Sequence, residues 1–161
     1  MFYRFFLVVV LLCTSLFAQN PLSHIKLEKA VFEELIAIDT LGIKSKKLIS
    51  VQGKTVRHGA TLVYVNRLTN TSRVTKQDVV VSNPIPFKTA YLRGSATCEG
   101  NCQIKFSIDG GKSFDFGENL YVIYGKGKRV AKGSEYTDVQ FIFPYLTPFS
   151  KTRMAFKARL K

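Results

Sequence analysis

Short strand-forming segments separated by turn residues recur along this chain, and this pattern constrains its fold more than any other feature. The clearest segment, residues 60–70, reads ATLVYVNRLTN and places Leu62 and Tyr64 on one face of a strand and Val63 on the other. Similar segments follow at intervals of roughly eight to twelve residues, at 77–85, 103–108, 118–124, 137–144 and 153–160. No long amphipathic helix is required anywhere. The pattern predicts an all-β fold, an antiparallel sandwich or a barrel.

The strand predicted at 77–85 ends in two prolines, within the sequence NPIPF at residues 83–87. Proline has no amide hydrogen to donate to a central ladder, so Pro84 and Pro86 stop the strand and hold the following chain extended. We expect Ile85 to turn inward and the next strand, around Tyr91, to join a second sheet. This stiff crossover favours the sandwich. A polyproline ligand for a partner is the other interpretation, and the missing P-x-x-P spacing disfavours it.

Residues 1–18 have the composition of a secretory signal peptide, with Arg4 in the basic start and a largely apolar run over residues 7–17. The apolar run is shorter than the roughly 20 residues of a membrane-spanning helix. We predict a signal helix cleaved after Ala18, export of the remaining chain, and no stable membrane span after cleavage. An uncleaved anchor is the alternative. A lipid anchor on Cys13 is disfavoured because Leu12, not a small residue, precedes it.

Residues 19–58 are expected to form an N-terminal strand or hairpin extension, packed on a sandwich domain of residues 59–161. The segments IKLEKAV and LIAID, within residues 25–39, alternate apolar and polar residues over part of their length. Residues 46–51 are predicted as a returning strand. One alternative stays open, because residues 30–36, AVFEELI, also fit one or two turns of an amphipathic helix.

Basic residues outnumber acidic ones, with 24 Lys and Arg against 11 Asp and Glu and a formal net charge of +13. This balance favours anionic partners, and export argues against nucleic acid as the natural one. Because the basic residues are spread along the chain, a simply solvated surface is the other interpretation. The segment GKGKRVAKG, residues 125–133, is the candidate contact with an anionic surface, through Lys126, Lys128, Arg129 and Lys132. The alternative for this segment is a mobile, solvated loop.

Two cysteines, Cys98 and Cys102, follow the predicted signal peptide, in the sequence CEGNC. In an exported chain such a pair predicts a disulfide, and Glu-Gly-Asn between the cysteines is typical of a turn. We expect the bond to pin the tip of a tight hairpin. A redox pair or half of a metal site is the alternative, but the spacing is not C-x-x-C and neither His24 nor His58 is close in sequence.

No catalytic, cofactor or metal-binding pattern stands out. The stretch GGKS at 110–113 is not a phosphate-binding loop, because Phe106 occupies the position of the required first glycine, so we predict a hairpin-type turn over 109–112. Asp109, Asp115 and Glu118 lack the dense spacing of calcium ligands. The two histidines are far apart and suggest no triad. We therefore expect no enzymatic activity, no cofactor and no metal site.

The sequence Asn70-Thr71-Ser72 is interpreted as a turn at the end of a strand. The same three residues match the acceptor pattern for an N-linked glycan. Nothing else in the sequence supports a glycan there.

Several motifs together resemble a known family. Tyr64 and Asn70 in the first strand, valines 79–81, Asn83-Pro84-Ile85-Pro86, Tyr91, Gly94-Ser95-Ala96 and the hairpin SIDGGKSF at 107–114 match a pattern over residues 59–161. This pattern is similar to that of the bacterial conserved-repeat family called domain of unknown function eleven. The resemblance implies an immunoglobulin-like β-sandwich on an exported or surface-exposed bacterial protein, and it brings no catalytic residues.

The sequence thus predicts an exported, non-enzymatic β-sandwich with a structural or protein-interaction role in the bacterial cell envelope, in the periplasm or at the cell surface. Its partner would be an envelope protein. The net positive charge supports the alternative of a module that binds anionic glycans or lipopolysaccharide surfaces.

Overall fold

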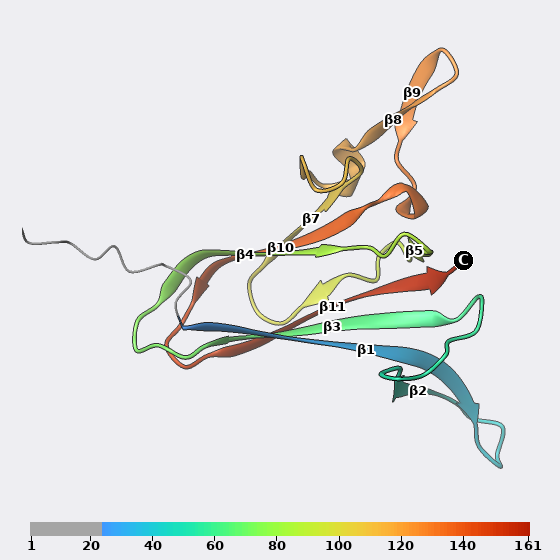
Figure 1. Cartoon of the computed structure of the whole chain (residues 1–161), viewed down its shortest axis with the longest axis horizontal. Helices are drawn as coiled ribbons and strands as arrows, with labels where there is room; N and C mark the ends of the chain where they lie inside the picture. Colours follow the sequence, from blue (N-terminus) through green and yellow to red (C-terminus); the bar gives the residue numbers. More distant parts are fainter. Residues whose placement is uncertain (1–23) are drawn as a thin grey trace, which may run out of the picture.

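Two antiparallel β-sheets stacked on one another make up the body of the molecule in a computed structural model, which describes residues 24–161 (Figure 1). The larger sheet has the order β2 (Lys44–Ser50), β1 (Ile25–Ile38), β3 (Thr61–Asn70), β11 (Lys151–Leu160), β5 (Thr89–Tyr91), with β6 (Thr97–Cys98) also paired to β11. The smaller sheet has the order β4 (Lys76–Pro84), β10 (Asp138–Leu146), β7 (Gln103–Ser107). The predicted all-β sandwich is confirmed, while the predicted signal helix lies outside the described residues.

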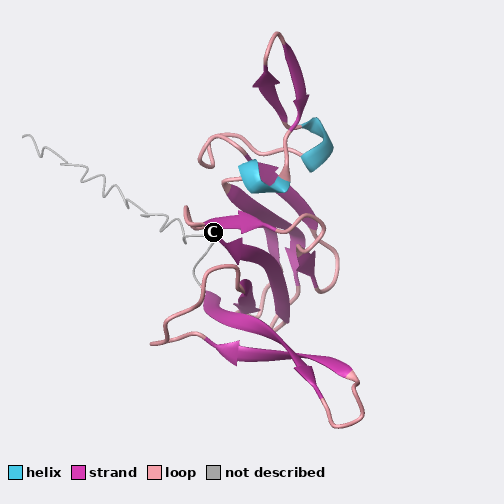
Figure 2. Cartoon of the chain, turned by 90° about the vertical axis from the view of Figure 1, so that its right-hand side faces the viewer, coloured by secondary structure: helices cyan, strands magenta, loops and turns pink. Residues whose placement is uncertain are grey.

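A separate two-stranded sheet and two short 3₁₀ helices complete the part of the chain that the structure describes. The strands are β8 (Tyr121–Tyr124) and β9 (Gly127–Val130), and the helices are η1 (Gly117–Asn119) and η2 (Gly133–Glu135). Figure 2 shows the β8–β9 hairpin standing away from the two main sheets.

The hydrophobic core lies between the two main sheets and follows the period-two pattern of the sequence. On β11, Met154, Phe156 and Ala158 are buried, whereas Arg153 and Arg159 are exposed. The facing residues of β10, among them Phe141 and Phe143, are also buried. Removing one such large side chain from water stabilises the fold by about 1.5–3 kcal/mol, so these alternating residues decide which face of each strand turns inward.

The proline-rich segment carries the chain from one sheet to the other, as predicted. β4 ends at Pro84, and both prolines are exposed. Ile85 is buried, and its amide donates a hydrogen bond of 2.8 Å to the carbonyl of Thr137. The chain then enters β5 of the larger sheet, where Tyr91 is buried in the core.

Strand β1 runs without a break from Ile25 to Ile38, so the helical alternative for residues 30–36 is wrong. β1 pairs with β3 from Ile25 to Glu34 and with β2 from Phe32 to Ile38. Residues 25–50, expected as an extension, thus supply two strands to the larger sheet. Beyond the reach of β3, residues 35–48 form a hairpin that projects from the sandwich, which we call the β1–β2 arm (Figures 1 and 2).

The two cysteines lie at disulfide-bonding distance, with Cα atoms 6.5 Å apart. The prediction that they lie at the tip of a tight hairpin is wrong. Cys98 ends β6, which pairs with β11 in the larger sheet, whereas β7 begins just after Cys102 and pairs with β10 in the smaller sheet. The pair therefore spans a turn that passes between the two sheets.

Asn70 ties together three chain segments at one end of the sandwich. Its side chain is fully buried, and Nδ2 donates to the carbonyls of Val74, Leu146 and Thr147 at 2.9, 3.1 and 3.0 Å. Its Oδ1 accepts from the amide and the hydroxyl of Ser72 at 3.0 and 2.7 Å. Because Nδ2 is enclosed by these carbonyls, the folded chain leaves no room for a glycan on Asn70.

Candidate functional site

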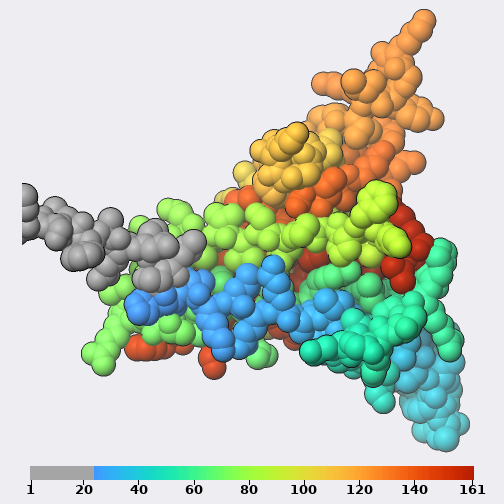
Figure 3. Space-filling view, in the orientation of Figure 1, coloured from blue at the N-terminus to red at the C-terminus, as the bar shows by residue number. Residues whose placement is uncertain are grey.

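The basic segment 125–133 is the end and second strand of a projecting hairpin, not the loop that the sequence predicted. β8 and β9 pair from Tyr121–Val130 to Tyr124–Gly127, and Gly125 and Lys126 make the two-residue turn. Gly125 has φ +61°, which a glycine adopts at no steric cost at the first position of such a turn. We call residues 121–130 the β8–β9 arm. Figures 1 and 3 show that it extends well beyond the body of the sandwich.

Large apolar side chains of the β8–β9 arm face solvent. Ile123 is 88% exposed, Tyr124 71% and Tyr121 47%. Because neighbouring residues of a strand point to opposite faces, Tyr121 and Ile123 lie on one face of the arm and Tyr124 on the other. The predicted cations flank them: Lys128 Nζ lies 4.9 Å from the ring centroid of Tyr121, and Lys126 lies at the exposed tip. The arm thus combines exposed rings with positive charge.

Arg129 has a different role from the other three predicted cations. Its guanidinium forms two hydrogen bonds of 2.7 Å with the carboxylate of Glu135, which also accepts from the Lys132 amide at 2.7 Å. These bonds lower the pKa of Glu135 to about 2, with the Arg129 hydrogen bonds as the largest cause. Arg129 therefore fastens the arm to η2. Lys126, Lys128 and Lys132 are exposed and form no ion pair among residues 24–161.

The base of the β8–β9 arm is built into the core. Leu120 and Ala131 flank the arm and are buried, and the Ala131 amide donates a 2.7 Å hydrogen bond to the Leu120 carbonyl. Gly133 begins η2 and lies so close to β5 that a Cβ there would be 2.9 Å from the Tyr91 carbonyl oxygen. The exposed side chains of the arm therefore stand on a fixed base.

The β1–β2 arm is a second exposed apolar surface. Its turn is fixed by Asp39, whose Oδ1 accepts hydrogen bonds from the amides of Leu41 and Ile43 at 2.9 and 2.8 Å. Leu41 is 83% exposed, and Ile36, Ile38 and Ile43 are exposed as well. The sequence predicts strands here, and nothing in its pattern indicates that the isoleucines lie outside the core. Figure 3 shows both arms at the same end of the molecule, one in orange and one in cyan.

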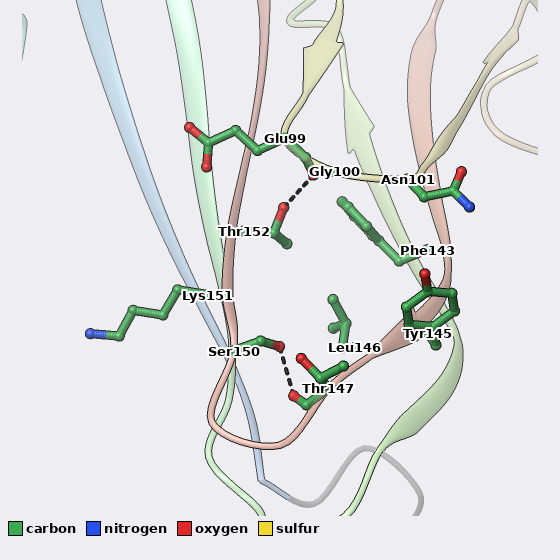
Figure 4. Close-up of a pocket in the computed structure, with 10 residues that line it drawn as sticks. All are labelled: Glu99, Gly100, Asn101, Phe143, Tyr145, Leu146, Thr147, Ser150, Lys151 and Thr152. Atoms are coloured by element: carbon green, nitrogen blue, oxygen red, sulfur yellow. Dashed lines mark hydrogen bonds between the residues drawn. The ribbon is translucent and has the colours of Figure 1, made fainter.

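A depression of about 270 Å³ lies at the other end, around the turn between β10 and β11 (Figure 4). Two of its hydroxyl groups are used locally: Thr152 donates to the Glu99 carbonyl at 2.8 Å and Ser150 to the Thr147 carbonyl at 2.7 Å. Figure 4 shows the charged groups of Glu99 and Lys151 directed away from the cavity. This depression does not assemble a nucleophile with a base.

The stretch that superficially resembles a phosphate loop is a turn, as predicted. Gly110 and Gly111 have φ of +77° and +78°, and Asp109 Oδ1 accepts hydrogen bonds from the amides of Lys112 and Ser113, both at 3.0 Å. Hydrogen bonds from Ser113 are the main cause that holds the pKa of Asp109 well below its usual range. The amides of Lys112 and Ser113 are thus already bonded to Asp109 and are not offered to a phosphate.

Acidic and histidine residues do not converge on a site within residues 24–161. No group of three or more His, Cys, Asp or Glu side chains in this part of the chain is placed to hold a metal ion. Neither His24 nor His58 uses its imidazole in a hydrogen bond or ion pair with another described residue. No helix in the same range is both long and apolar enough to cross a membrane.

Comparison with known proteins gives no further assignment: no protein-family model matches the chain, and no curated protein matches it.

Proposed function

We propose that this chain is an exported, non-enzymatic β-sandwich protein of the bacterial cell envelope that binds a protein partner through the β8–β9 arm. The single observation that carries the proposal is the exposure of Tyr121, Ile123 and Tyr124 on a hairpin whose base is anchored in the core. Soluble proteins rarely leave contiguous apolar side chains in water without a partner. Tyrosines supply much of the binding energy in protein interfaces, because they bury a large area with little loss of entropy.

Export is supported by the composition of residues 1–18 and by the cysteine pair. Disulfides persist in oxidising compartments, and Cys98 and Cys102 lie at bonding distance. The resemblance of residues 59–161 to the conserved-repeat family, with its immunoglobulin-like domains on exported bacterial proteins, supports the same location. These three features favour the cell envelope, either the periplasm or the outer surface.

A second candidate function is the binding of anionic glycan or lipopolysaccharide. The observation that favours it is the position of Lys128 beside the ring of Tyr121, with Lys126 exposed at the tip of the same arm, on a chain with a net charge of +13. Aromatic faces next to cations suit anionic sugars, and contacts of this kind weaken as salt screens the charges.

Site-specific photo-crosslinking distinguishes these functions. A photoreactive phenylalanine analogue replaces Ile123 on the arm or, as the control, Phe149, which is exposed in the turn at the far end of the sandwich. We expect a protein adduct of defined mass from position 123 in intact cells, and none from position 149. An adduct at neither position, or the same adduct at both, would overturn the assignment of the arm.

Salt and charge variants test the second function directly. The double variant Lys126→Gln, Lys128→Gln is compared with the unchanged protein for binding to purified lipopolysaccharide at about 0.05 M and about 0.5 M salt. Binding that is strong at low salt and lost in both the variant and high salt would establish the glycan candidate. Absence of binding at low salt would exclude it.

A further inference from the structure

The smaller sheet leaves one edge strand, β4, open along the near face of the sandwich. Among the strands of residues 24–161, β4 pairs only with β10, and the Ile85 amide donates to the Thr137 carbonyl at the end of this ladder. Antiparallel ladders alternate, so every second residue of β4, including Val79 and Val81, directs its backbone groups toward β10. Val80 and Ser82, which lie between them, direct their amide and carbonyl groups to the open edge.

An apolar groove runs beneath this edge, between β4 and β1. A cavity of about 320 Å³ is lined by Ile25 and Leu27 of β1 and by Val79 and Val81 of β4. A second cavity of about 190 Å³ follows along the same seam and reaches Val31. Figure 3 shows β1 in blue and β4 in yellow-green side by side along this face. The groove is separate from the two arms.

A buried donor without an acceptor lies in the second cavity. Asn83 is buried, and its Oδ1 accepts a 2.6 Å hydrogen bond from Nδ2 of Asn66. Asn83 Nδ2 has no hydrogen-bond partner among residues 24–161. A buried donor that nothing satisfies destabilises the folded chain, so the seam favours an occupant that brings an acceptor.

The mouth of the same cavity is positively charged. Lys29 of β1 lines it, is exposed, and forms no ion pair within residues 24–161. An acidic side chain of an occupant would complement this charge.

We propose that the β4 edge binds an extended peptide segment of a partner protein, which joins the smaller sheet as a fourth strand. Backbone groups of Val80 and Ser82 supply the hydrogen bonds, as in other cases where a peptide extends an open sheet edge. Alternate apolar side chains of the peptide fill the groove, a polar acceptor reaches Asn83, and an acidic side chain faces Lys29. Pro84 marks the end of the site, because it has no amide hydrogen to offer.

The test uses the ¹⁵N-labelled exported chain and a synthetic peptide of roughly eight residues that alternates valine and threonine and carries one aspartate. We expect the amide signals of Val80 and Ser82 to shift and to become protected from hydrogen exchange. Val80→Pro removes an edge amide that β10 does not use and should abolish binding, whereas Val80→Thr should keep it. Shifts confined to other strands would overturn the proposal.

A charge exchange keeps the test valid if Val80→Pro fails to fold. Lys29→Glu should lower the affinity for the aspartate peptide about fivefold, the upper range for a partly exposed ion pair. A peptide that carries lysine in place of the aspartate should restore the affinity of this variant. Lys105→Glu, on β7 at the opposite edge of the same sheet, is the matched control and should leave the affinity unchanged. Equal loss in both variants, or self-association through β4 seen by sedimentation, would overturn the proposal.

Discussion

Replacing Asn70 with alanine should destabilise the protein more than any other single change to a polar side chain described above. The substitution removes two amide donors shared among three carbonyls and one oxygen that accepts twice from Ser72. Each hydrogen bond contributes about 1 kcal/mol net, and the buried carbonyl of Leu146 would lose a partner. The structure therefore predicts a loss of about 3–5 kcal/mol in the free energy of unfolding, a large part of the usual total of about 5–15 kcal/mol.

Urea denaturation followed by circular dichroism measures this loss. Tyrosine fluorescence is the second probe, because the chain has 7 tyrosines and no tryptophan. With a slope of about 2 kcal/mol per molar urea, the midpoint should fall by about 2 M. The melting temperature should fall by more than about 10 °C.

Asn101→Ala is the matched control for this experiment. Asn101 is exposed in the turn between β6 and β7 and makes no side-chain hydrogen bond with another described residue. Its replacement should change the stability by no more than about 0.5 kcal/mol. If the free energies of unfolding of Asn70→Ala and Asn101→Ala lie within about 1 kcal/mol of each other, the reasoning from buried hydrogen bonds is refuted.

Three further predictions follow from the arm and the cysteine pair. The pKa of Glu135 is lowered to about 2, so its ion pair with Arg129 stabilises the fold above about pH 4.5 and is lost as the pH falls toward 2. The difference in melting temperature between the unchanged protein and Glu135→Gln should therefore shrink as the pH falls from 4.5 to 2. A difference that stays constant over this range would contradict the role of the pair. Mass spectrometry of the unreduced protein should show Cys98 and Cys102 two hydrogens lighter than free thiols, and their bond should add about 2 kcal/mol of stability; two free thiols would exclude it. Gly133→Ala forces a Cβ to 2.9 Å from the backbone of β5 and should cost about 1–3 kcal/mol in thermal unfolding, whereas Gly127→Ala, with no contact closer than 4.0 Å, should cost less.

The strands of the sandwich were predictable because their burial alternates in the sequence itself. Met154, Phe156 and Ala158 appear at every second position and are all buried. The crossover after β4 was predictable for a different reason, since Pro84 and Pro86 act on the backbone locally whatever surrounds them.

The arms and the disulfide geometry were not predictable, because each depends on distant parts of the chain. The tip of the β8–β9 arm, residues 123–128, is exposed on both faces, so its sequence carries no alternating pattern that would distinguish a strand from a loop. Apolar residues such as Ile36 and Ile38 look like core residues until their strand is seen to outrun its neighbour β3. The cysteine spacing showed that the sulfur atoms could meet, but not that β6 and β7 would belong to different sheets.

The candidate site was therefore only partly visible in the sequence. The sequence indicates Lys126 and Lys128 as candidate contacts, while the exposed rings on the same arm fit an ordinary strand pattern. Arg129 resembles these lysines in the sequence, and only the fold brings its guanidinium to Glu135, six residues along the chain. A bidentate pair of this kind requires a turn and a helix whose geometry the residue spacing does not specify.

The lysines on β2 bear on how this protein behaves at high concentration. β2 is the outermost strand of the larger sheet, and Lys44, Lys46 and Lys47 are exposed along it. Two copies that met edge to edge through β2 would bring six ammonium groups together, and this repulsion discourages fibril growth from an otherwise open template. The β1–β2 arm can thus expose its apolar side chains without this edge of the sheet promoting aggregation.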